Sequence, residues 1–323
     1  MERNKGLEEI NSLFKEIMKD KEMIVSFFCL GLRNSEFSLF AIQITDSYYV
    51  AHSEDILYRP AYEEFKRRKP KDFFKFVHSA GELENGVSKN IDKRRVYIDL
   101  EENIIYSINT QCAGNSVGLK KLALRLAIQK AEEEGWFAEH MFIIGVKDKR
   151  GESAYLCGAY PSMCGKTSTA LLEGETVIGD DIAYLRVRDG KVYAANVERG
   201  IFGIIKDVNS KDDPILFKAL IKEGEVIFSN VLVDENNTPY WLGKDSFHPV
   251  KGINFSEEWF LGKKDKDGNQ IPASHKNARY TLRLISLENV DEKLEDPCGV
   301  EVKGIIYGGR DSDTSVPVEQ SFN

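Results

Sequence analysis

The spacing of apolar residues in the first third of the chain predicts a mixture of helices and strands. Four apolar residues recur at helical spacing: Leu7, Ile10, Phe14 and Ile17. The elements expected in this region are a helix over 7–17, strands over 23–30 and 37–44, a loop over 46–60, a helix over 60–68, and a hairpin with strands over 96–100 and 104–108. We therefore expect a mixed α/β domain over residues 1–115.

The pattern changes after residue 115, where helices and buried strands begin to alternate. The expected elements are a helix over 116–135, strands over 141–146 and 154–159, a helix over 167–172, a strand over 176–178, and a hairpin that turns at Asp189 and Gly190. Residues 207–279 are polar and predict loops, with strands over 226–233 and 240–241, and a last strand is expected over 304–307. These segments predict a second domain, residues 116–323, with a mixed sheet.

Charge and cysteine usage narrow the class of protein. The net charge is −8, and basic residues alternate with acidic ones, so a general attraction to nucleic acid or anionic lipid is not expected. No apolar run is long enough to span a bilayer, and the first residues lack the order of a secretory signal. The five cysteines are scattered, which argues against a disulfide framework and a cysteine zinc site. We expect a cytoplasmic monomer without nucleic-acid or membrane partners.

The segment 160–167, YPSMCGKT, predicts a phosphate-binding loop. It ends in the GKT of a Walker A motif, in which backbone N–H groups and the lysine hold phosphate and the threonine holds a metal ion. The match is partial, because Tyr160 stands where the motif has its first glycine. Since the segment lies between an expected strand and an expected helix, the nucleotide-binding interpretation is favoured.

Two acidic residues, Asp180 and Asp181, follow the expected strand over 176–178. Phosphoryl transfer needs an acid at a strand end to hold the metal ion that bridges the phosphates, and either aspartate could supply it. The commoner use of such a pair is to end a strand in solvent or to cap a turn. Its combination with the phosphate loop favours metal binding.

Five motifs, in this order along the chain, resemble the GTP-type phosphoenolpyruvate carboxykinases: GWFAEHMFIIGV, YPSMCGKT, VIGDDIAYL, HKNARY and GIIYGGR. The likeness extends from Met23 to Asn323 and is strongest over 114–202. It implies an α/β carboxykinase fold that decarboxylates oxaloacetate to an enolate and transfers the γ-phosphate of GTP to it, forming phosphoenolpyruvate, GDP and CO2. It also implies a catalytic Mn2+, a Mg2+ bound with the nucleotide, and a chain that is incomplete at its C-terminal end.

The resemblance further assigns roles to single residues. Those implied to be catalytic are Cys164, the reactive cysteine of the loop, Lys166 and Arg279. Those implied to bind the nucleotide are Ser162, Met163, Cys164, Gly165, Lys166, Thr167 and Asp180. Those implied to bind the substrate are Gly114, Ser162, Asn277, Arg279 and Arg310. Those implied to bind metal ions are His140, Asp181, Thr167 and one of the two lysines Lys120 and Lys121.

The choice between the two lysines stays open in the sequence. Aligning the paired lysines of the family selects Lys121, whereas counting back from His140 selects Lys120. A lysine binds a metal ion only as the neutral amine, so burial and the ion itself must lower its pKa. The alternative is that both lysines lie on the solvent face of an amphipathic helix, as most helical lysines do.

Two departures from the family pattern bear on activity. The substrate-binding arginine of the family falls on Asp55, and we expect Arg59, one helical turn away, to replace it. The tyrosine of the family's substrate pocket falls on Cys112. Two alternatives to a GTP-dependent enzyme remain. The family's guanine-binding segment is expected beyond Asn323, which leaves open the same fold with ATP, ITP or pyrophosphate as phosphoryl donor, and Asp55 and Cys112 would suit a truncated, non-catalytic phosphate-binding domain.

Overall fold

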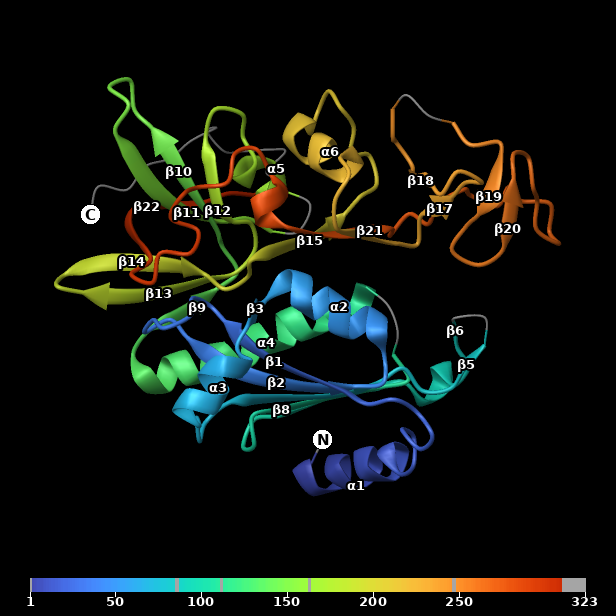
Figure 1. Cartoon of the computed structure of the whole chain (residues 1–323), viewed down its shortest axis with the longest axis horizontal. Coiled ribbons are helices and arrows are strands. Elements are labelled where there is room, and N and C mark those ends of the chain that lie inside the picture. Colours follow the sequence, from blue (N-terminus) through green and yellow to red (C-terminus); the bar gives the residue numbers. More distant parts are fainter. Residues whose placement is uncertain (1, 85–86, 111–112, 162–163, 246–247, 310–323) are drawn as a thin grey trace.

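The computed structural model describes residues 2–84, 87–110, 113–161, 164–245 and 248–309. Two parts lie one above the other in Figure 1: a six-stranded sheet with its helices below, and a larger part built on a seven-stranded sheet above. Both sheets contain parallel and antiparallel pairs, which confirms the expected mixed α/β class. None of the helices in the described ranges is long and apolar enough to cross a membrane.

The lower sheet has the strand order β3-β1-β2-β4-β8-β7. In that order the strands are Arg59–Pro60, Ile24–Leu30, Leu39–Thr45, Phe74–Ser79, Ile104–Ile108 and Arg95–Asp99. Pairs β2–β4 and β4–β8 are parallel. Figure 1 shows helices α2 (Tyr48–Leu57) and α4 (Ala113–Glu134) above this sheet and α1 (Arg3–Phe14) below it, while α3 (Tyr62–Arg68) contacts β1.

The upper sheet has the strand order β12-β10-β11-β22-β14-β13-β9. In that order the strands are Thr176–Gly179, Phe142–Lys147, Ser153–Ala159, Val300–Tyr307, Lys191–Asn196, Ala183–Arg188 and Phe137–Glu139. Strand β22 is the last strand in the described part of the chain but lies in the middle of the sheet, parallel to β11 and antiparallel to β14. The short helix α5 (Lys166–Ala170) contacts β10 and β12.

Smaller sheets and short helices complete the upper part. The three-stranded sheet is β15 (Gly200–Ile204), β21 (Arg279–Arg283) and β16 (Val226–Ser229). The four-stranded sheet is β18 (Pro239–Tyr240), β17 (Leu232–Val233), β19 (Lys251–Ile253) and β20 (Glu258–Phe260). The upper part also contains α6 (Pro214–Ile221) and the 3-10 turn η2 (Leu284–Ser286), whereas the pair β5 (Leu83–Glu84) and β6 (Val87–Ser88) and the 3-10 turn η1 (Ile91–Lys93) belong to the segment between β4 and β7 of the lower sheet.

The two parts share buried side chains. Phe28 of β1, Leu126 of α4 and Tyr184 of β13 belong to one hydrophobic cluster. Helix α2 also contacts β15 and β21 of the upper part, and so lies between the two parts. The expected domain boundary at residue 115 falls inside α4 and stays a prediction.

Most of the expected elements are present within a few residues of their predicted bounds. The hairpin at residue 189 is an example: Asp189 and Gly190 have φ angles of 52° and 73°, as a tight turn between twisted strands requires. The expected strand over 226–233 is divided into β16 and β17, which belong to different sheets.

Two expectations of loop structure were wrong. Residues 46–60 were expected to be a loop, but α2 forms there, because Ser47 caps the helix by accepting a hydrogen bond from Val50 N–H and because apolar side chains such as Ile56 are buried. The other is α6, which begins at Pro214 and buries an almost wholly apolar sequence. In both helices the free energy gained by burying apolar side chains outweighs the tendency of the polar residues around them to form a loop.

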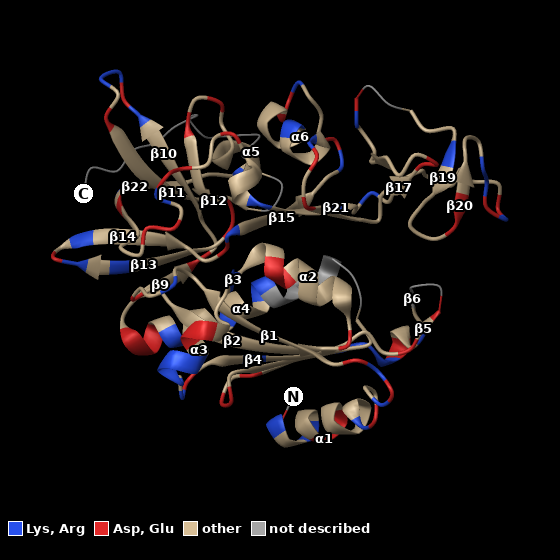
Figure 2. Cartoon of the chain, viewed as in Figure 1, with Lys and Arg blue, Asp and Glu red and all other residues tan. Residues whose placement is uncertain are grey.

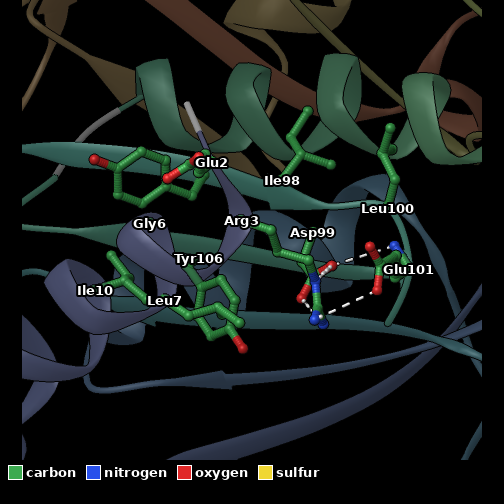
Figure 3. A pocket seen from close by; sticks show the side chains of 11 residues that line it. Glu2, Arg3, Gly6, Leu7, Ile10, Ile98, Asp99, Leu100, Glu101 and Tyr106 are labelled. Carbon is green, nitrogen blue, oxygen red and sulfur yellow. Dashed lines mark hydrogen bonds and ion pairs between the residues drawn. The ribbon is translucent and has the colours of Figure 1, made fainter.

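Helix α1 lies against the hairpin of β7 and β8. The guanidinium of Arg3 donates two hydrogen bonds to Asp99, at 2.9 and 2.8 Å, and Figure 3 shows this pair at the edge of a hollow of about 370 Å³. Leu7, Ile10 and Tyr106 line the same hollow. It lies on α1 and the β7–β8 hairpin, and shares no residue with the phosphate loop or the paired aspartates.

Acidic and basic residues alternate over both parts of the ribbon in Figure 2, as the sequence led us to expect. Helix α3 shows a local order, with Glu63 and Glu64 in its first turn and three basic residues in its last turn. This order complements the helix dipole, which favours negative charge at the N-terminus and positive charge at the C-terminus.

Candidate active site

A cavity of about 550 Å³ lies where the phosphate loop, the paired aspartates and α4 meet. Its walls come from several separate places in the chain. These are Lys120 and Lys121 of α4, His140 after β9, Tyr160 and Pro161 after β11, residues 165–168 at the start of α5, Asp180 and Asp181 after β12, residues 202–204 of β15 with Lys206 after it, and Arg279 and Tyr280 of β21. Segments far apart in the sequence thus bring most of the expected site residues to one cavity.

Asp181 is the centre of this arrangement. Its Oδ1 lies 2.5 Å from His140 Nε2 and also accepts a hydrogen bond from the ammonium of Lys166. Its Oδ2 lies 2.9 Å from Lys120 Nζ and 3.3 Å from Lys121 Nζ. Burial alone would raise the pKa of Asp181, but these nitrogens hold that pKa well below its usual range.

His140 Nε2 has two close neighbours and cannot form a hydrogen bond with both at once. Lys121 Nζ and Asp181 Oδ1 each lie 2.5 Å from this one nitrogen. A ring nitrogen either donates one proton or accepts with one lone pair, so it cannot accept from the lysine and donate to the carboxylate at the same time. Three donor atoms that converge in this way suit a cation placed among their lone pairs, and imidazole, amine and carboxylate together suit a transition-metal ion.

The geometry separates the two lysines. Lys121 is about 39% exposed at its side chain and contacts both His140 and Asp181, so it lies on the open side of the cluster. Lys120 is buried and is ion-paired with Asp181 and, at 2.8 Å, with Glu198 Oε1. Burial lowers the pKa of Lys120, but the carboxylates around it, Asp181 first, more than reverse this effect and raise the pKa above its ordinary value. This favours Lys121 as the metal ligand.

The remaining acid of the pair, Asp180, is buried beside this cluster. Burial raises its pKa, while the charge of Lys120 opposes the shift. Among the described residues nothing forms a hydrogen bond to its Oδ1. A buried carboxylate oxygen without a donor has the potential to take part in binding a cation or a water molecule.

No group of three or more His, Cys, Asp and Glu side chains lies close enough to hold a metal ion in the part of the chain that the structure describes. His140 and Asp181 provide only two such ligands. A complete site at this position therefore needs the amine of Lys121 as a third ligand. The donor set fits a metal ion only if this lysine is counted.

The phosphate loop turns at Gly165, which has a φ of 84° and nothing within contact distance of the position of a β-carbon. Helix α5 follows at once, beginning with Lys166. Burial lowers the pKa of Lys166, and Asp181 and Asp180 oppose this effect. Thr167 also lines the cavity, and Cys164 before the turn is half-buried. The expected residues Ser162 and Met163 lie outside the described residues.

The substrate-binding residues expected in HKNARY adjoin one another. Arg279 lines the cavity, donates a hydrogen bond of 2.6 Å to Asn277 Oδ1, and lies over the ring of Phe202. Burial lowers the pKa of Arg279. Asn277 is exposed and does not line the cavity itself, but it accepts the hydrogen bond from Arg279, which does. Gly114 is in the first turn of α4, and Arg310 and Cys112 lie outside the described residues.

Arg59 does not line the cavity, and the structure contradicts the expectation that it replaces the family arginine. Its side chain is fully buried and donates to Glu295 Oε2 at 2.8 Å. It also donates to four backbone carbonyl groups, those of Gly31, Asn196, Val197 and Leu294. The guanidinium has no free face for a substrate. Asp55 is exposed and ion-paired with Arg283 at 2.7 Å, also outside the cavity.

Two charged residues near the site were missed in the sequence. Lys206 lines the cavity after β15, and Glu198 is the buried partner of Lys120. Neither belongs to a motif with known spacing, and Glu198 stands in an ordinary connection between two strands. Only the folded contact with Lys120 identifies it.

Comparisons with known proteins identify the family of the chain. The family model for the phosphoenolpyruvate carboxykinase N-terminal domain matches residues 1–132, and that for the C-terminal P-loop domain matches residues 136–323. Proteins named phosphoenolpyruvate carboxykinase [GTP] from Pyrococcus abyssi and Thermococcus kodakarensis are each 56% identical over the whole chain, which covers 53% and 52% of their lengths. The one from Sulfurisphaera tokodaii is 50% identical over 99% of the chain and 50% of its own length.

The chain thus spans about half the length of the curated relatives it matches. Both family models together cover nearly all of it, and the relatives match it over its whole length. The chain belongs to the GTP-dependent phosphoenolpyruvate carboxykinase family.

Proposed function

We propose that this chain carries the metal-binding and phosphate-binding part of an enzyme that converts oxaloacetate and GTP to phosphoenolpyruvate, GDP and CO2. The observation that carries the proposal is the convergence of Lys121, His140 and Asp181 on one point, directly beside Lys166 of the phosphate loop. Decarboxylation and phosphoryl transfer must occur in one place, because the enolate made by the first step is the nucleophile of the second. A shared cavity of about 550 Å³ meets this requirement.

The proposed metal ligands are Lys121, His140 and Asp181, a donor set that suits a transition-metal ion, and Mn2+ is the ion that the family resemblance implies there. Bound there, the ion would act as a Lewis acid toward the negative charge that develops on the substrate oxygen. Mg2+ is proposed to enter with the nucleotide, near Thr167. Asp180 adds a buried carboxylate on the nucleotide side.

The side chains of the chain itself would hold the two substrates. Arg279 is placed to bind a carboxylate of oxaloacetate, with its orientation fixed by Asn277 and the ring of Phe202. Lys166 would bind the transferred phosphate and offset its charge. Cys164, Gly165 and Thr167 shape the loop around it. No general base is required, because loss of CO2 leaves the electron pair on the enolate.

The names of the relatives favour GTP over ATP, ITP or pyrophosphate as donor. The location in the cytoplasm and the monomeric state expected from the sequence belong to this proposal as well. Cell fractionation and light scattering test these two points.

The test supplies oxaloacetate, Mn2+ and each phosphoryl donor in turn, and measures phosphoenolpyruvate and CO2. We expect phosphoenolpyruvate with GTP, together with an equal amount of CO2 above that released without the protein, and neither of these in the Asp181→Asn variant. If product forms with another donor but not with GTP, that other molecule is the phosphoryl donor of the enzyme. If the protein binds Mn2+ and nucleotide but forms no product with any donor, the non-catalytic alternative holds instead.

A further inference from the structure

Glu198 lies behind the proposed metal site, in the connection between β14 and β15. The residue is fully buried, and its Oε1 is 2.8 Å from Lys120 Nζ. The same lysine nitrogen is 2.9 Å from Asp181 Oδ2. Glu198, Lys120 and Asp181 therefore form a line of alternating charges that leads from the protein interior to the cavity.

The backbone around Glu198 is held firmly in place. Arg59, which is itself buried, donates to the carbonyl groups of Asn196 and Val197 just before it. The carbonyl of Val197 also accepts from Gly31 N–H at 2.9 Å, and the N–H of Arg199 donates to Leu57 at 2.8 Å. Contacts from the lower sheet and from α2 thus fix the position of the carboxylate.

The charges near Asp181 explain why such a carboxylate matters. Three lysines, Lys120, Lys121 and Lys166, contact Asp181. Lys120 is buried, so its charge is poorly screened by water and would repel a divalent cation bound to Asp181. A second carboxylate on the far side of Lys120 offsets this charge without occupying the cavity.

We propose that Glu198 is a positioning residue of the metal site: it offsets the charge of Lys120, so that Lys120 can hold Asp181 in place without repelling the bound ion. This inference rests on the proposed function of Lys121, His140 and Asp181 as metal ligands. Residues that support metal ligands from behind commonly change affinity by about 10- to 100-fold when they are replaced.

The experiment measures Mn2+ binding to the full chain by the loss of the free-ion electron paramagnetic resonance signal. Burial raises the pKa of Glu198 to about 7, so the titration is made at about pH 8, where the carboxylate is ionised. We expect Glu198→Gln to weaken Mn2+ binding by about tenfold or more, and Glu198→Asp, which keeps the charge, to remain within about threefold of the parent. Circular dichroism gives the folded fraction, and affinity is calculated per folded molecule.

Two further variants separate charge from folding. Glu64→Gln is the matched control, because Glu64 is another buried glutamate, lies on α3 outside the cavity, and should leave Mn2+ affinity unchanged. The double variant Lys120→Met with Glu198→Gln removes both charges and should bind Mn2+ more tightly than Glu198→Gln alone. Replacing a buried ion pair with neutral groups of similar size is commonly tolerated. The double variant therefore still tests charge compensation by Glu198 if the single variant Glu198→Gln unfolds.

The outcomes are distinct. If the parent chain binds no Mn2+, the proposed metal site is wrong, and this inference is wrong with it. A parent that binds Mn2+, with equal affinity in Glu198→Gln, overturns the inference and leaves the site standing. A double variant no better than Glu198→Gln also overturns it, because charge compensation would then have no effect.

Discussion

At the scale of single residues, motif residues were predictable and their supporting partners were not. Asp181 and Lys166 were identified because their motifs place them after a strand and before a helix, and the structure brings them into contact. Lys120 and Lys121 could not be separated, since adjacent residues on a helix differ only in the direction they face. Glu198 carries no motif, because its role depends on a contact made across the fold.

The proposed ligand His140 gives a prediction at this scale. Replacing His140→Gln should weaken Mn2+ binding by at least about tenfold, because an imidazole nitrogen is lost from the converging set. Isothermal titration with Mn2+ measures the effect. His52→Gln is the control: His52 is exposed and paired with Glu225 at 2.7 Å, so its loss should not change the affinity. Equal binding by both variants would remove His140 from the site.

At the scale of elements, periodicity predicted strands and amphipathic helices well, and failed where burial is unusual. Helix α2 was missed because the polar residues within and around it favoured a loop, yet two of them, Ser53 and Glu54, are buried with its apolar residues. Strand β4 was not expected, although Phe74 and Phe76 alternate toward the core. A run of basic residues precedes it in the sequence, and in the fold it pairs in parallel with β2 and β8.

The end of β2 gives a prediction of pH dependence. Asp46 follows this strand and accepts hydrogen bonds from Lys21, Ser79 and Ala80 N–H. Burial raises the pKa of Asp46, but these donors outweigh it and leave the pKa below its ordinary value. The unfolded chain therefore binds the proton more tightly than the folded one, so this stability is present at neutral pH and is lost as the pH falls through the folded pKa.

Urea unfolding between about pH 7 and pH 3 checks this point. In Asp46→Asn the free energy of unfolding should be lower at neutral pH, and its decrease toward acid should be smaller than in the parent. Asp267→Asn, in an exposed turn, is the control and should follow the parent at every pH. An Asp46→Asn curve parallel to the parent would show that the carboxylate contributes no linked stability.

At the scale of the whole molecule, the sequence indicated two parts but not how they are joined. The family resemblance implied the fold of each part, and the mixed sheets agree with it. The junction depends on Arg59, which extends from β3 of the lower sheet to Glu295 and the carbonyl of Leu294 in the upper part. From the sequence, Arg59 was assigned to the substrate. Nothing in the neighbouring residues shows that this arginine is buried and bonded to five protein acceptors.

Replacing Arg59→Lys tests this junction. The ammonium cannot reach all the acceptors of the guanidinium, so we expect the free energy of unfolding to fall by about 2–4 kcal/mol. Denaturant titration measures the change. Arg150→Lys is the control, because Arg150 is an exposed arginine paired within its own turn, and a change of at most about 0.5 kcal/mol is expected. A loss of stability no larger than that of the control would mean that Arg59 does not join the parts.

The central position of β22 has a consequence for synthesis on the ribosome. Strand β14 ends at Asn196, but β22, which lies between β14 and β11, begins only at Val300. At about 5–20 residues per second, the nascent chain spends roughly 5–20 s with the facing edges of β11 and β14 unpaired. Unpaired strand edges are sites of aggregation, so these two edges are where a chaperone should be needed most during translation.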